Sequence, residues 1–80
     1  MNLYEFSFLT DEEREEIIRS RAAFLASRVD EEWLFDLYAL DGFYVEFFYL
    51  THDHGVIKSR CFTSPDELKP YLGLIDIDIN

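Results

Sequence analysis

The chain has 80 residues, with 49% apolar and 18% aromatic side chains, and its 17 acidic against 7 basic residues give a net charge of −10. This length limits it to one domain, residues 1–80, with a thin core, and the aromatic content excludes a chain that stays disordered. The acidic excess predicts repulsion from nucleic-acid phosphates and anionic lipids, so we expect no nucleic-acid partner and no membrane partner.

Three observations predict a cytoplasmic location. The sequence has no apolar window of roughly eighteen residues that would span a bilayer, and its first residues lack the basic and apolar regions of a signal peptide. The single Cys61 has no partner for a disulfide within the chain, whereas small secreted domains normally carry paired cysteines.

The first expected element is an amphipathic helix over residues 10–28. Thr10 followed by Glu13 predicts a capping box at its start. Acidic residues crowd the first turn and arginines follow toward the far end, which matches the helix dipole. The apolar positions that recur at helical spacing are Ile18, Ala22, Leu25 and Val29.

A β-hairpin is expected next, from strands Trp33–Leu40 and Phe43–Leu50. The dipeptide Asp41-Gly42 between them tolerates the positive φ angles of a two-residue type I′ turn. If these two residues form the loop, the register of the hairpin follows. The expected pairs include Leu40 with Phe43, Tyr38 with Val45, Leu37 with Glu46, Asp36 with Phe47, and Leu34 with Tyr49.

A third antiparallel strand is expected over residues 56–62, after the turn His52-Asp53-His54-Gly55. We expect Tyr49 opposite Lys58 and Phe47 opposite Arg60, which completes a three-stranded meander. The N-terminal helix should then cover one face of this sheet. That face would carry Trp33, Phe35, Leu37, Phe48 and Ile57.

The C-terminal part begins with a second helix start, in which Ser64 caps, Pro65 takes the first helical position and Glu67 closes a capping box. Pro70 and the following glycine limit this helix to about two turns. Residues 74–80 alternate strictly, so they add an edge strand to their own sheet or to a partner's, or they fray as termini do. The expected fold class is α+β, in the order α-β-β-β-α.

The hairpin has apolar side chains on both faces, and one amphipathic helix cannot cover both. Three explanations of what covers the second face are possible. The aromatic N-terminal arm and the short C-terminal helix cover it, or a second copy packs on it across a twofold axis, or a different protein binds there.

Candidates for chemistry are few. Glu46 falls on the face under the expected helix, where a shifted register, an ion pair with Arg21 or Arg28, or a role as a catalytic acid would each explain it. His52 and His54 supply two ligands where zinc needs three or four, and Cys61 has no neighbouring base. We therefore expect no catalytic, metal or cofactor site, and no enzyme.

The leading interpretation is an acidic protein-interaction or regulatory module whose partner is another protein or a second copy in a homodimer. Three alternatives remain: a toxin-neutralising, immunity-like protein; an acidic mimic of a nucleic-acid backbone; and a small enzyme or metal protein using Glu46, His52, His54 and Cys61. The contact surface expected for the leading interpretation consists of Tyr38, Phe43, Val45, Phe47 and Tyr49.

Overall fold

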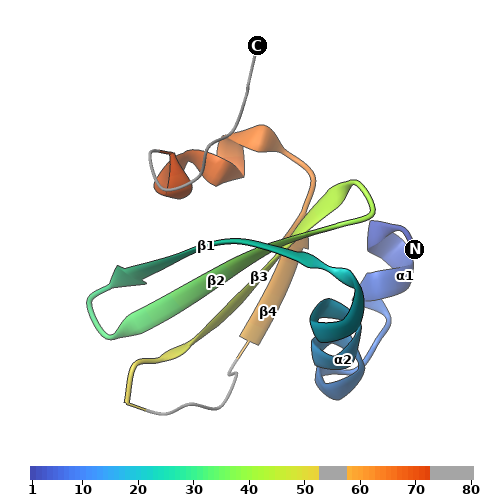
Figure 1. The fold of residues 1–80 in the computed structure, drawn as a ribbon, viewed down its shortest axis with the longest axis horizontal. Helices are drawn as coiled ribbons and strands as arrows, with labels where there is room; N and C mark the ends of the chain where they lie inside the picture. Colours follow the sequence, from blue (N-terminus) through green and yellow to red (C-terminus); the bar gives the residue numbers. More distant parts are fainter. Residues whose placement is uncertain (53–57, 73–80) are drawn as a thin grey trace.

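The computed structural model describes residues 1–52 and 58–72. Its four strands form one antiparallel sheet in the order β1-β2-β3-β4 (Figure 1), so the expected α+β class and meander are confirmed, with one strand more than expected. The elements are α1 (Leu3–Ser7), α2 (Asp11–Arg21), β1 (Ala23–Asp30), β2 (Trp33–Leu40), β3 (Phe43–Leu50), β4 (Lys58–Phe62) and the 3-10 helix η1 (Pro65–Tyr71).

Both N-terminal helices begin at a capping box. In α2 the Thr10 side chain accepts from the Glu13 backbone N–H and the Glu13 carboxylate accepts from the Thr10 N–H, as the sequence predicts. In α1 the same exchange joins Asn2 and Glu5. The aromatic N-terminal arm therefore contains a short helix that we did not expect.

Helix α2, which the sequence predicted to extend to residue 28, is shorter than expected. It ends at Arg21, and the chain continues as strand β1. Ala22, Leu25 and Val29 have helical spacing but do not share a face: Ala22 and Leu25 pack on different core clusters, and Val29 is exposed. The β1 register shifts between Phe24 and Ala26, where one extra residue interrupts the alternation of a regular strand. Pairing with β1 also gives the backbone groups along one side of β2 their partners.

The β2–β3 hairpin has the register that the sequence predicts. Leu40 pairs with Phe43 and Tyr38 with Val45, and the pairing continues without a shift to Trp33 and Leu50. The turn residues Asp41 and Gly42 have φ angles of 47° and 90°, as a type I′ turn requires.

The pairing of β3 with β4 differs by one residue from the prediction. Glu46, not Phe47, lies opposite Arg60, and Phe48, not Tyr49, lies opposite Lys58. A shift of one residue moves every side chain of the strand to the other face. The sequence-based register was therefore wrong, and Arg60 shares a face with Glu46. Residues 56–57, expected to begin this strand, lie outside the described residues.

The two faces of the sheet are covered by different elements, and the expected assignment of the helix was wrong. Helices α1 and α2 lie beside the β2–β3 turn (Figure 1) and pack on the face of Leu40, Phe43, Val45 and Phe47, which we call the helical face. Phe6 of α1 and Ile18 of α2 complete that cluster. The sequence placed the helix on the side of Leu37 instead.

The opposite face, called here the η1 face, packs against the C-terminal 3-10 helix. Leu68 and Tyr71 of η1 join Ala26, Leu37 and Phe62 in a second buried cluster. Ser64 caps η1 and Pro65 begins it, as expected, although the Ser64 hydroxyl accepts from Asp66 rather than from Glu67. The expected strand over residues 74–80 lies outside the described residues.

The β2–β3 turn gives a test of the fold. Replacing Gly42 by Ala should lower the free energy of unfolding by about 1 kcal/mol, since an L side chain is strained at positive φ. No atom lies within 4 Å of the position that a Cβ would take, so the loss reports the backbone alone. Chemical denaturation measures it. Gly42→Asn should cost less, and an alanine variant as stable as the parent would contradict the type I′ turn.

Candidate functional site

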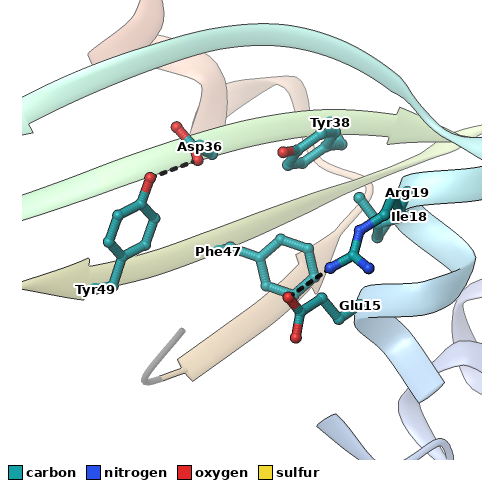
Figure 2. A pocket seen from close by; sticks show the side chains of 7 residues that line it. All are labelled: Glu15, Ile18, Arg19, Asp36, Tyr38, Phe47 and Tyr49. Carbon is teal, nitrogen blue, oxygen red and sulfur yellow. Dashed lines mark hydrogen bonds and ion pairs between the residues drawn. The ribbon is translucent and has the colours of Figure 1, made fainter. Parts of the chain in front are cut away.

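A pocket with a cavity volume of about 260 Å³ opens on the helical face, between α2 and the β2–β3 hairpin (Figure 2). One wall is helical and polar, and the floor is mostly aromatic. The pocket is lined by Glu15, Ile18 and Arg19 of α2, Asp36 and Tyr38 of β2, and Phe47 and Tyr49 of β3.

The regular periods of helix and strand bring these residues together. Glu15, Ile18 and Arg19 are three and four residues apart, so they share one side of α2. On each strand the lining residues are two apart and point to the same face. Asp36 pairs with Phe47, which places the two strand pairs side by side.

Asp36 is the charged group of the floor, and its known partners are neutral. The Ser27 hydroxyl donates to Oδ1 at 2.5 Å, and the Tyr49 hydroxyl donates to Oδ2 at 2.8 Å. All seven Lys and Arg residues of the chain lie in the described segments. None of them forms an ion pair with Asp36 there, so this half-buried carboxylate has no Lys or Arg counter-ion.

The carboxylate and the apolar surroundings act on the neighbouring phenols. Desolvation, followed by the hydrogen bond to Asp36, raises the pKa of Tyr49 to about 12. Desolvation and the charges of Asp36 and Glu15 also raise the pKa of Tyr38, against the opposing effect of Arg19. Both phenols are neutral at physiological pH, and the Tyr49 hydroxyl keeps its proton for Asp36.

Arg19 lies at the rim of the pocket and is held by its own helix. Its Nη2 lies 2.9 Å from Oε1 of Glu15, four residues earlier, and 75% of the Arg19 side chain is exposed. An exposed pair of this kind contributes little to stability and reopens readily. The rim therefore carries one cation and one carboxylate that are free to rearrange.

The structure divides the five residues that the sequence placed in a contact surface. Tyr38, Phe47 and Tyr49 line the pocket, whereas Phe43 and Val45 do not. Phe47 is nevertheless buried, with 5% exposed, in the same core cluster as Phe43 and Val45. Sequence reasoning missed the α2 residues because it placed the helix on the other face. It also missed Asp36, although a single charged residue within an otherwise apolar strand was a usable signal.

Glu46 is the most deeply buried charged residue described, with 2% of its surface exposed, and it lies on the η1 face. Its Oε1 accepts from Nε of Arg60 at 2.9 Å, and its Oε2 accepts from the hydroxyl of Tyr71. Arg28 adds an ion-pair contact at 3.9 Å. Of the sequence interpretations, the shifted register after β3 is confirmed. Arg28 does contact Glu46, but from β1 and not from the expected helix, and Arg21 pairs with Asp41.

The expected histidine and cysteine candidates do not gather in the described part of the chain. His52 is exposed, His54 lies outside the described residues, and Cys61 is half-buried against the core of the helical face. Within residues 1–52 and 58–72, no three His, Cys, Asp or Glu side chains are close enough to hold a metal ion. No helix of these segments is long and apolar enough to cross a bilayer.

Comparison with models of known protein families, with curated proteins and with solved structures gave no match to this chain. The pocket and its charges are therefore the features from which a function can be inferred.

The Asp36–Tyr49 contact predicts how stability depends on alkaline pH. Because the folded pKa of Tyr49, about 12, exceeds its ordinary value of 10.0, its contribution is complete below pH 10.0 and is lost as pH rises through about 12. Denaturation across this range should show that loss, and Tyr49→Phe should reduce it. An unchanged alkaline profile in the variant would contradict the contact.

The Glu46 cluster gives a second test. Tyr71→Phe should lower the free energy of unfolding by about 1–3 kcal/mol, because it leaves a buried carboxylate oxygen without its donor. Tyr44→Phe is the matched control, since Tyr44 lies on the same face and its hydroxyl has no hydrogen-bond partner in the described segments. Equal stabilities of the two variants in urea denaturation would show that Tyr71 acts by packing alone.

Proposed function

We propose that this protein is an acidic interaction module that binds a basic protein partner, and that the pocket receives a cationic side chain of that partner. The observation that carries the proposal is Asp36, a half-buried carboxylate with neutral hydrogen-bond donors and no Lys or Arg counter-ion in the described segments. A half-buried carboxylate is partly desolvated, and a partner's cation would supply the opposite charge that it lacks.

The remaining charge of the chain supports this choice of partner. The net charge of −10 attracts a basic surface over a long range and accelerates its encounter. The half-buried Tyr38 and Tyr49 add aromatic surface of the kind that anchors protein interfaces. The proposed role is binding rather than catalysis, and we place it in the cytoplasm.

A toxin-neutralising, immunity-like protein is one form that such a module takes, because it too must bind a basic target. Self-association through the aromatic residues stays a prediction. In the single chain, however, α1 and α2 cover Phe43 and Val45, so those two residues do not support self-association. Two copies of charge −10 also repel each other, which favours a partner of opposite charge.

A variant pair tests the proposal against general electrostatics. Asp36→Asn should weaken binding of a synthetic peptide, with arginine and lysine in a glycine and serine background, by about tenfold. Glu16→Gln removes the same charge from an exposed site on α2 outside the pocket, and its effect should be small. Fluorescence anisotropy with a labelled peptide gives both dissociation constants.

The same titration at low and at physiological ionic strength separates steering from anchoring. Binding by the parent should weaken with salt, while the ratio between parent and Asp36→Asn should persist, because a partly buried pair is screened less than exposed charges. Equal losses in the Asp36 and Glu16 variants would refute a role for the pocket and leave only the general acidic surface.

A further inference from the structure

We infer that the group recognised by the pocket is an arginine guanidinium, and that a lysine ammonium is a poor substitute. This inference rests on the proposed function and names the side chain that the partner inserts. It depends on a comparison between the two carboxylates that lie on opposite faces of the same sheet, Glu46 and Asp36.

The η1 face holds one arginine, Arg28, between aromatic rings and a buried carboxylate of the same chain. The guanidinium carbon of Arg28 lies 3.9 Å from the ring centroid of Phe35 and 5.2 Å from that of Tyr71. Its Nη2 lies 3.9 Å from Oε2 of Glu46, which also accepts from the Tyr71 hydroxyl. A carboxylate, a phenol that donates to it and a flat aromatic surface thus surround one arginine.

The helical face has a similar set of groups, but its one lining arginine, Arg19, pairs with Glu15 and not with the floor carboxylate. Asp36 takes the place of the carboxylate, the Tyr49 hydroxyl donates to it, and the rings of Tyr38 and Phe47 lie beside it in the pocket (Figure 2). The two rings meet edge to face with centroids 5.8 Å apart, which leaves the pocket with a rigid aromatic corner. These groups border a cavity of about 260 Å³.

The chemistry of the corner favours guanidinium over ammonium. A guanidinium is planar and weakly hydrated, so it stacks on an aromatic ring while two N–H groups point at a carboxylate. An ammonium is compact and strongly hydrated, and a half-open aromatic pocket compensates its desolvation poorly. In the described segments, every cation that lies over an aromatic ring belongs to Arg14, Arg28 or Arg60.

The charge of Arg19 allows a second test of whether the pocket binds a cation or an anion. Its positive charge at the rim opposes an incoming cation, and its partner Glu15 is a second carboxylate facing the pocket. Arg19→Gln removes that repulsion and frees Glu15, so a guanidinium should bind the variant more tightly. An anionic ligand that uses Arg19 would instead lose affinity.

The experiment is an NMR titration of the ¹⁵N-labelled protein with two matched probes, N-acetyl-arginine methylamide and N-acetyl-lysine methylamide. We expect saturable shifts at Asp36, Tyr38, Phe47 and Tyr49 with the arginine probe, and at least about fivefold weaker binding of the lysine probe. Arg19→Gln should bind the arginine probe more tightly. Asp36→Asn should abolish the shifts that this probe causes, with the rest of the spectrum unchanged.

The outcomes separate this inference from the proposed function. Equal binding of the two probes, shifts that map elsewhere, or weaker arginine binding by Arg19→Gln would overturn the guanidinium assignment. If basic peptides still bind with Asp36 dependence, the proposed function stands without it. If the basic peptide also binds Asp36→Asn and Glu16→Gln with equal dissociation constants, the proposed function fails as well. If Asp36→Asn does not give the spectrum of a folded protein, the titration is repeated with Ser27→Ala and Tyr49→Phe. Each of these variants removes one hydrogen-bond donor to the Asp36 carboxylate.

Discussion

The buried carboxylate of Glu46 is the constraint on which the rest of the structure depends. A charge with 2% exposure on a central strand is tolerated only if opposite charge and hydrogen-bond donors reach it. Arg28 from β1, Arg60 from β4 and Tyr71 from η1 meet that need. The sheet order, the register of β4 and the position of η1 are therefore coupled through one side chain.

The coupling extends beyond the carboxylate itself. Nη1 of Arg60 also lies 2.8 Å from Oε1 of Glu67, which ties the start of η1 to the edge strand. Hydrogen bonding to Glu46 raises the pKa of Arg60, so the guanidinium stays charged. The η1 face is thus closed by interactions within the chain, while the Asp36 carboxylate on the helical face has only neutral donors. This difference between the two faces makes the pocket the candidate for recognition.

Local rules predicted the elements whose causes are local. The capping box at Thr10, the Asp41-Gly42 turn and the start of η1 at Pro65 depend on residues next to one another in the chain. Strand β1 was misread because its irregular register hides the two-residue period. The one-residue error at β4 then placed Arg60 on the wrong face and left Glu46 without its nearest cation.

The sequence by itself determined the α+β class, the hairpin register and the aromatic character of both sheet faces, because the period of a strand and the chemistry of a two-residue turn fix them. Tertiary structure alone decided which face each helix covers. Burial drives helices onto any apolar face, and both faces of this sheet are apolar. The pocket follows from that choice, since Glu15 and Arg19 reach Asp36 and Tyr38 only when α2 lies on their side of the sheet.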